Sequence, residues 1–294
     1  MKNIIKSEID KEKRGFDLYF KGLLDLYLTN SYLDKVMLYS VINGGKRIRP
    51  YLIKEFSKIK QIPTKQYYQL SAVIEIIHSY SLIHDDLPSI DNDDFRRGKL
   101  STHKKFNEAQ AILAGDSLHD LAFEILSDLN IKRSNITIKL INLLSISLGS
   151  SGLAGGQSLD LLYENKNIPT KDIVNMYKLK TGGLFKFCCV APFIISKSNK
   201  SEINFASNYG ETFGLVFQIV DDYMDYVSTK KKIGKTPKKD LKQNKSTIHK
   251  NLKNKDIKNF CISIVNDFEN KNIFYIKKWS KLKNLLFYLI GQLD

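Results

Sequence analysis

The sequence predicts an all-α fold, a single-domain helical bundle without a sheet. Six prolines occur in 294 residues, and apolar residues recur at helical spacing along most of the chain. No segment shows the strict apolar–polar alternation of a half-buried strand. No long glycine- and serine-rich linker interrupts the chain either. Residues 1–294 are therefore expected to share one core, for which this length is ample.

The clearest helix is expected at residues 69–87, where apolar residues fill one broad stripe. Pro88 ends this helix, because the residue before a proline avoids the α region. In chain order, the same spacing predicts helices at 33–42, 69–87, 108–129, 135–148, 170–179, 210–226 and 257–268. Both acidic clusters described below close a long helix, which suggests a repeated arrangement around a central cleft.

Composition indicates an ordinary globular protein, with 43% apolar and 26% charged residues. The formal charge of +15 would suit an anionic partner such as nucleic acid, a membrane or a phosphorylated substrate. Much of the excess is lysine in the last third of the chain, so we interpret it as a solvated basic surface without a nucleic-acid partner. No apolar run approaches the ~20 residues that span a bilayer, and no signal peptide is evident.

Three cysteines form no metal-ligand or disulfide pattern. Cys188 and Cys189 lie in an apolar run, where we expect small core residues, and Cys261 stands alone. Unpaired cysteines imply a reducing compartment, and hence a cytoplasmic location.

Two clusters of carboxylates carry the strongest functional signal. Residues 84–98 read HDDLPSIDNDDFRRG, and residues 221–225 read DDYMD. Clustered carboxylates repel one another, so they are stable only on a solvated loop or around a cation. Mg²⁺ suits such oxygen ligands and completes its shell with water and substrate phosphate. We therefore expect the clusters to face each other across a cavity; the alternative is a solvated turn and an unrelated helix cap.

Spacing places some of these side chains relative to each other. Asp221 and Asp225, at i and i+4, would share one helix face. Pro88 prevents the step from Asp85 to Asp91 from being a regular helix. His78 precedes Asp85 by seven residues, about two helical turns, so both should point the same way.

The motifs together resemble the trans-prenyl diphosphate synthases, most closely the bacterial-type farnesyl diphosphate synthases. Besides the two clusters, the resemblance rests on GGKRIRP at 44–50, AGDSL at 114–118, GGQSLD at 155–160, KTG at 180–182 and FQIVDD at 217–222. It implies a homodimer of helical bundles of the isoprenoid synthase type, each built around a deep cavity. It also implies condensation of isopentenyl diphosphate with dimethylallyl and geranyl diphosphate, giving farnesyl diphosphate.

The resemblance assigns roles residue by residue. Three Mg²⁺ ions would be held by Asp85, Asp86, Asp91, Asp221, Asp222 and Asp225. Mn²⁺ is the alternative ion. The allylic diphosphate would contact Arg96, Lys180 and Lys235. The second diphosphate would contact Gly45, Lys46, Arg49, His78 and Arg97. Thr181 and Gln218 would line the path of the allylic cation. His84 either orients nearby carboxylates or is plain packing.

Product length is expected to depend on residues just before the first aspartate. In the family, bulk at the fourth and fifth positions before it sets the floor of the tunnel that holds the growing chain. Here Ser81 is small and Tyr80 is bulky. Together with the two extra residues between Asp86 and Asp91, this matches the bacterial farnesyl pattern and predicts a C15 product. A geranylgeranyl diphosphate synthase with the same residues is the nearest alternative.

Other classes fit less well. A terpene cyclase would not need Lys46, Arg49 and Arg97 for a second diphosphate, and a non-catalytic subunit would have lost its aspartates. The sequence also departs from the family in the glycine-rich segment after the second cluster, where Lys238 and Asn244 replace expected glycines. The last residues lack the usual basic side chain as well. These departures affect closure and turnover rate more than the type of reaction.

Overall fold

The structure, a computed structural model, describes residues 2–42, 44–129, 134–227, 245–252 and 254–293. Contacts between its residues divide it into two compact units. The N-terminal unit comprises Glu8–Ile141, and the C-terminal unit comprises Met1–Ser7, Asn142–Ser228 and Lys238–Asp294, as far as these ranges are described. The first acidic cluster belongs to the N-terminal unit and the second to the C-terminal unit. The single domain therefore remains a prediction.

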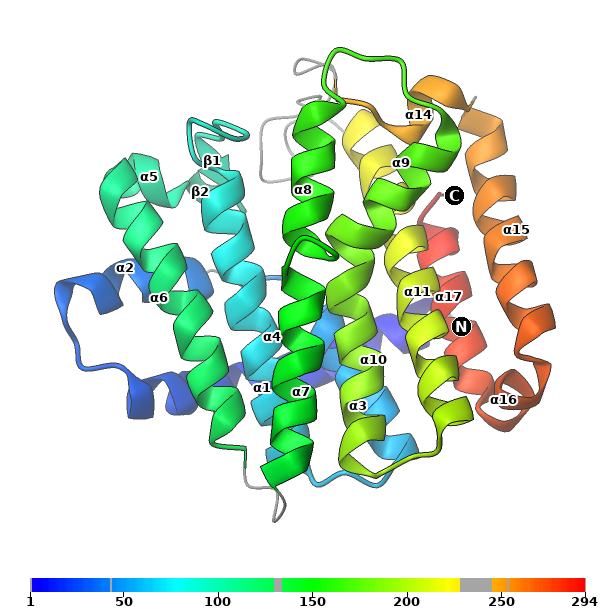
Figure 1. The fold of residues 1–294 in the computed structure, drawn as a ribbon, viewed down its shortest axis with the longest axis horizontal. Helices are drawn as coiled ribbons and strands as arrows, with labels where there is room; N and C mark the ends of the chain where they lie inside the picture. The colour runs from blue at the N-terminus through cyan, green and yellow to red at the C-terminus, as the bar shows by residue number, and fades with distance from the viewer. Residues whose placement is uncertain (1, 43, 130–133, 228–244, 253, 294) are drawn as a thin grey trace. The chain divides into compact units, whose positions relative to one another are not determined.

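The N-terminal unit is built of helices and one small hairpin (Figure 1). Its elements are α1 (Lys2–Tyr27, from Glu8 onward), α2 (Tyr32–Val41), α3 (Ile48–Ile59), α4 (Thr64–Asp85), β1 (Phe95–Arg96), β2 (Lys99–Leu100), α5 (Thr102–Lys105) and α6 (Glu108–Ser127). The strands are antiparallel, with Phe95 opposite Leu100. This pair of two-residue strands was not expected from the sequence, because it is too short to show alternation.

Helix α4 is the central helix of this unit and packs on both α3 and α6. Every residue from 69 to 77 is buried, including Ser71 and Glu75. The prediction of a single apolar stripe was therefore too narrow, because neighbours cover α4 on all sides. Gln69 shows how the polar groups are accommodated: its Nε2 donates to the Ile125 carbonyl of α6 at 2.9 Å.

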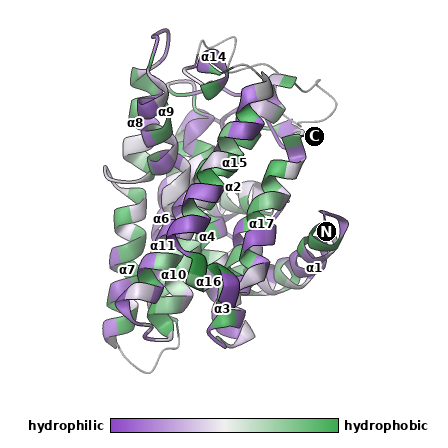
Figure 2. Cartoon of the chain, turned by 90° about the vertical axis from the view of Figure 1, so that its right-hand side faces the viewer, coloured by the Kyte–Doolittle hydropathy of each residue, from purple (hydrophilic) through white to green (hydrophobic). Residues whose placement is uncertain are grey.

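The C-terminal unit is also helical. Its elements are α7 (Ser134–Leu148, from Asn142 onward), α8 (Leu153–Leu162), α9 (Thr170–Tyr177), the π-helix η1 (Lys178–Gly182), α10 (Gly183–Ile195), α11 (Lys200–Val227), α14 (Ile248–Asn251), α15 (Asn254–Lys271), α16 (Ile273–Lys278), α17 (Ser280–Ile290) and the 3₁₀-helix η2 (Gly291–Leu293). Helices α15 and α17 carry both hydrophilic and hydrophobic residues, as amphipathic helices do (Figure 2).

The core of this unit centres on α10, which packs along α11. Phe185, Phe187, Cys188 and Cys189 of α10 are fully buried. Cys261 on α15 is buried too, and all three cysteines are free thiols. The prediction that the adjacent cysteines are small core residues is thus confirmed.

Several predicted helices differ from the observed ones; the helix expected at 69–87, for example, runs from Thr64 to Asp85. The helix expected from Gly210 begins ten residues earlier, at Lys200. Gly210 lies inside α11, and its lack of a side chain lets α10 pass very close: a Cβ there would lie 2.6 Å from the Cα of Lys186. The helix expected at 170–179 continues from α9 directly into η1.

The segment Asn135–Leu162 is long and apolar enough, by length and composition alone, to cross a membrane. It consists of two separate helices, α7 and α8, with a turn at residues 149–152. Core helices of soluble proteins can be equally long and apolar, and the predicted lack of a membrane span remains a prediction.

Candidate active site

The first acidic cluster follows α4, which ends at Asp85. The chain then folds back: the Asp91 N–H donates to the Asp85 carbonyl at 2.8 Å, and the Asp93 N–H donates to the Asp86 carbonyl at 3.1 Å. Pro88 lies in the turn between them. The prediction that residues 85 to 91 are not a regular helix is therefore confirmed.

Arg96 on β1 forms ion pairs with Asp86 and Asp93. Its Nε donates to the two carboxylate oxygens of Asp86 at 3.0 and 3.2 Å, and its Nη2 lies 3.3 Å from Asp93 Oδ2. Burial raises the pKa of Asp86, although Arg96 opposes this. Burial lowers the pKa of Arg96, but attraction to Asp86 outweighs it and leaves that pKa raised. Asp86 thus serves here to fix Arg96, whereas Asp85 and Asp91 are only half-buried.

The basic loop at residues 44–50 meets Arg97. The Arg97 Nη1 donates to the Gly44 carbonyl. Gly45 has a φ of 137°, a conformation that favours glycine, and a Cβ there would approach the Arg97 guanidinium to 3.2 Å. Lys46 is exposed and Arg49 is half-buried. The structure therefore places Gly44 and Gly45 of this loop against Arg97, and the role of the loop in binding a diphosphate stays a prediction.

Arg47, in the middle of this loop, is turned away from solvent and is not among the residues expected at the site. It is 4% exposed, has a φ of 50°, and its Nε lies 2.8 Å from Asp17 Oδ1. Its Nη1 pairs with Glu75 of α4. Glu75 is the one glutamate in the predicted helix at residues 69–87. It was the sequence signal that could have revealed a buried cationic partner. Arg47 anchors the loop to α1 and α4, and its neighbours in sequence can face outward.

His78, also on α4, lies in a strongly positive environment. Burial lowers its pKa well below the usual value, and the nearby charges of Arg49 and Arg97 lower it further. His78 is consequently neutral at pH 7 and can donate one N–H to an anion. Because it lies two turns before Asp85, one helix carries both a carboxylate and a group surrounded by arginines.

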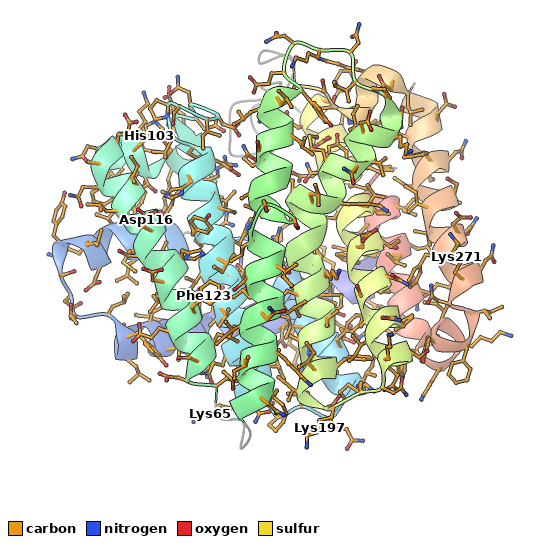
Figure 3. All side chains as sticks on the ribbon, viewed as in Figure 1. Lys65, His103, Asp116, Phe123, Lys197 and Lys271 are labelled. Atoms are coloured by element: carbon orange, nitrogen blue, oxygen red, sulfur yellow. The ribbon has the colours of Figure 1, made fainter. Side chains whose placement is uncertain are left out.

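The residues expected to limit product length are on the same helix. Ser81 is buried, and its hydroxyl donates to the His78 carbonyl at 3.0 Å. The Tyr80 ring is half-buried and packs edge-on against His84, at 5.1 Å between centroids. Nε2 of His84 lies 3.7 Å from Asp116 Oδ1 on α6, a residue marked in Figure 3. His84 therefore packs against the Tyr80 ring and lies near Asp116 but beyond hydrogen-bond distance, so a role in orienting carboxylates stays a prediction.

In the C-terminal unit, a chain of hydrogen bonds surrounds the second cluster. The Thr181 hydroxyl donates to Gln218 Oε1 at 2.5 Å, and Gln218 Nε2 donates to Asp222 Oδ1 at 2.7 Å. The Tyr177 hydroxyl donates to the other oxygen of Asp222, and accepts from the Ile248 N–H at 3.2 Å. Both oxygens of Asp222 are therefore occupied by protein donors, an arrangement that the sequence did not reveal.

The three aspartates of this cluster differ in exposure. Asp221 is exposed, whereas Asp222 and Asp225 are 7% and 5% exposed. All three lie on α11, so the helical spacing of Asp221 and Asp225 is confirmed. Of the three, Asp221 is the most accessible to a metal ion.

A second cluster of polar groups joins α8, η1 and the segment before α14. Asp160 is 5% exposed, and its Oδ2 accepts from Lys180 Nζ at 2.5 Å and from Lys245 Nζ at 3.3 Å. Burial would raise the pKa of Asp160, but the two lysines outweigh it and lower that pKa. Lys245 was not among the expected site residues; the motif around residues 234–247 drew attention to Lys235 instead. Lys235, Lys238 and Asn244 lie outside the described residues.

The carboxylates fit magnesium. Within the part of the chain that the structure describes, no group of three or more His, Cys, Asp or Glu side chains is placed to hold a metal ion. Mg²⁺ is usually bound through one or two carboxylates together with water and substrate phosphate. Asp85 with Asp91, and Asp221, are oxygen ligands of this kind.

Comparison with known proteins identifies the family. The sequence model described as Polyprenyl synthetase matches residues 30–271. A farnesyl diphosphate synthase from Micrococcus luteus is 40% identical over 243 residues, which cover 81% of this chain and 83% of that protein. The farnesyl diphosphate synthase of Escherichia coli strain K12 is 39% identical over 222 residues, or 74% of each chain.

Solved structures agree. A geranyltransferase from Helicobacter pylori, complexed with magnesium and isoprenyl diphosphate, has a TM-score of 0.82 at 28% identity and covers 98% of this chain and 96% of its own. An FPP/GFPP synthase from Zymomonas mobilis has a TM-score of 0.81 at 31% identity, with 99% and 98% covered. The chain belongs to the polyprenyl synthetase family. The predicted all-α isoprenoid synthase fold and the predicted prenyltransferase class are both confirmed.

Proposed function

We propose that this chain condenses isopentenyl diphosphate with dimethylallyl and then geranyl diphosphate, and releases farnesyl diphosphate. In each round the allylic C–O bond breaks and its electron pair leaves with pyrophosphate. The double bond of isopentenyl diphosphate then forms a new C–C bond with the allylic cation, and loss of a proton restores neutrality. The hard step is separating an anionic leaving group from a cation in a dry pocket.

The observation that supports this most is the arrangement on α4. Asp85 ends the helix, and His78 lies two turns before it among Arg49 and Arg97. One rigid helix thus carries a carboxylate for a metal ion and, two turns away, a histidine that lies among arginines from other elements, which together suit an anion. A terpene cyclase, which takes a single diphosphate, would have no use for that second cradle.

We infer that Asp85 and Asp91 hold two Mg²⁺ ions and that Asp221 holds a third. When bound, these ions stabilise the charge that develops on the leaving diphosphate. Asp86 supports them by fixing Arg96 beside the cluster. Asp222 and Asp225 support Asp221 from buried positions on the same helix. Mn²⁺ has the same oxygen preference and is the alternative ion.

The cations divide between the two diphosphates. Arg96, Lys180 and Lys235 are proposed to contact the allylic diphosphate, and the contact of Lys245 with Asp160 beside Lys180 supports adding it to this group. Lys46, Arg49, His78 and Arg97, with the Gly45 backbone, are proposed to bind isopentenyl diphosphate. Thr181 and Gln218 offer oxygen dipoles to the cation, and they present no strong nucleophile that it would alkylate.

The decisive experiment is incubation of the protein with isopentenyl diphosphate, each allylic starter and Mg²⁺, followed by sizing of the products. A C15 main product that disappears on chelation of the metal would support the proposal. A C20 main product would instead favour a geranylgeranyl diphosphate synthase. An absence of condensation with every starter would contradict the proposal altogether.

We also infer that the protein acts in the cytoplasm as a homodimer. The three free, buried cysteines support a reducing compartment, and the family resemblance supports the dimer. Analytical ultracentrifugation tests the second point: sedimentation of a species with the mass of one 33.8 kDa chain at micromolar concentration would contradict it.

A further inference from the structure

The cluster around Asp160 carries an inference that deepens the proposed function. Asp160 lies on α8, Lys180 on the π-helix η1, and Lys245 on the segment before α14. Both lysine Nζ atoms lie close to a single oxygen, Oδ2, at 2.5 and 3.3 Å. Two ammonium groups held by one oxygen lie close enough to each other to repel strongly.

All three groups are withdrawn from water, which strengthens their interactions. The side chains of Asp160 and Lys245 are each 7% exposed, and that of Lys180 is 21% exposed. Burying a lysine is costly unless an anion compensates it. The carboxylate of Asp160 contacts both ammonium groups and so lowers the cost of burying each of them.

The backbone that carries Lys245 is fixed independently. The Ser246 hydroxyl donates to the carbonyls of Tyr163 and Lys166 at 2.8 and 2.9 Å, and the Ile248 N–H donates to the Tyr177 hydroxyl at 3.2 Å. Ser246 and Ile248 are both fully or nearly fully buried. Lys245 therefore starts from a defined position, and what remains adjustable is its long side chain.

We propose that Asp160 is a positioning residue that gathers Lys180 and Lys245 into one two-cation site for the leaving diphosphate. Without its charge the two ammonium groups repel each other, and their flexible side chains separate. With it, they stand side by side before the substrate arrives. Asp160 makes no contact with substrate in this account and acts only through the lysines. The inference rests on the proposed function, because it assumes that the lysines bind the allylic diphosphate.

The test is Asp160→Asn, which keeps the shape of the side chain and removes its charge. Misplacement of groups that stabilise a transition state can cost on the order of 100-fold in rate. We therefore expect kcat to fall about 100-fold and KM for isopentenyl diphosphate to change less than about twofold. Asp160→Glu, which restores the charge, should have a kcat at least about tenfold higher than that of Asp160→Asn. Asp172→Asn, an exposed carboxylate of the same unit, is the matched control and should leave kcat unchanged.

A mutant cycle separates positioning from a merely structural role. In a Lys180→Ala/Lys245→Ala background, measured with radiolabelled isopentenyl diphosphate, Asp160→Asn should change kcat less than about threefold. An equal loss in both backgrounds would overturn the proposal, as would a parental rate for Asp160→Asn in the intact protein. If Asp160→Asn does not fold, as judged by circular dichroism, Asp160→Ser takes its place in the cycle.

The assignment of the two lysines to the allylic diphosphate can be tested separately from the role of Asp160. If Lys180→Ala/Lys245→Ala keeps the parental kcat, the assignment of these lysines to the allylic diphosphate is wrong, and the role of Asp160 falls with it. If the lysine variant loses activity while the cycle is additive, only the role of Asp160 is wrong.

Discussion

Replacing Tyr177 by phenylalanine should destabilise the C-terminal unit substantially, because one buried hydroxyl serves two partners. Tyr177 is 3% exposed; its hydroxyl donates to Asp222 and accepts from the Ile248 N–H at 3.2 Å. A hydrogen bond to a charged group contributes about 1.5–3 kcal/mol, and an orphaned buried donor costs about 1–3 kcal/mol. The buried ring is common to both proteins and cancels, so the loss comes from the hydroxyl alone and is expected to be about 3 kcal/mol.

The assay is thermal unfolding followed by circular dichroism, with Tyr226→Phe as the control. For a chain of this size, 3 kcal/mol corresponds to a fall in Tm of about 6–12 °C. Tyr226 lies on α11, the helix that carries Asp222, but it is 38% exposed, so removing its hydroxyl should change the stability by less than about 0.5 kcal/mol. Equal Tm values for Tyr177→Phe and the parent would refute the assignment of that hydrogen-bond chain.

The same pair of proteins should respond differently to alkaline pH. Burial, and then the charge of Asp222, raise the pKa of Tyr177 well above the model-compound value of 10.0. A group whose pKa is raised in the folded state stabilises it fully below the unfolded pKa and loses that contribution as pH rises through the folded value. The difference in stability between parent and Tyr177→Phe should therefore be constant up to about pH 9 and shrink above pH 10. A difference that widens there would mean that the tyrosine is held ionised.

Three further predictions concern the reaction. Asp85→Ala or Asp221→Ala should lower kcat by orders of magnitude without unfolding the chain; a kcat near the parental value in either would contradict the metal assignment. Lys46→Ala and Arg97→Ala should mainly raise KM for isopentenyl diphosphate, since that diphosphate gains no charge in the transition state; a fall confined to kcat would mean that the two diphosphate sites are exchanged. Tyr80→Ala should shift the product from C15 to C20 or longer, measured by chromatography of the dephosphorylated products; an unchanged C15 product would remove Tyr80 as the limit.

Several features of the site follow from local sequence. Pro88 is sufficient to end α4 near Asp85, because proline restricts its own φ and the residue before it. The spacing of His78 and Asp85 fixes their relative direction once the segment is helical. The same holds for Asp221 and Asp225 on α11. These are short-range relations, and an isolated stretch of sequence contains what is needed to derive them.

Which of two adjacent charged residues is buried depends on residues that are distant in the sequence. Lys46 and Arg47 are neighbours, yet Lys46 is exposed while Arg47 is buried against Asp17 and Glu75. Nothing in the loop itself distinguishes them. The choice depends on carboxylates that α1 and α4 supply from distant positions in the chain, because a buried cation is tolerated only where such partners exist.

Local patterns in the sequence were enough to predict the class of the protein: helical periodicity predicted the all-α fold, and two carboxylate clusters with their basic motifs predicted a metal-assisted chemistry of diphosphates. How those charges are arranged depends on the packing of distant segments. This packing turned Asp86 toward Arg96, enclosed Asp222 between Gln218 and Tyr177, and brought Lys245 beside Lys180 on Asp160. The reason is physical. Residue type and spacing fix what a side chain can do, but burial and long-range partners fix its charge state and direction, and those arise only when distant segments pack together.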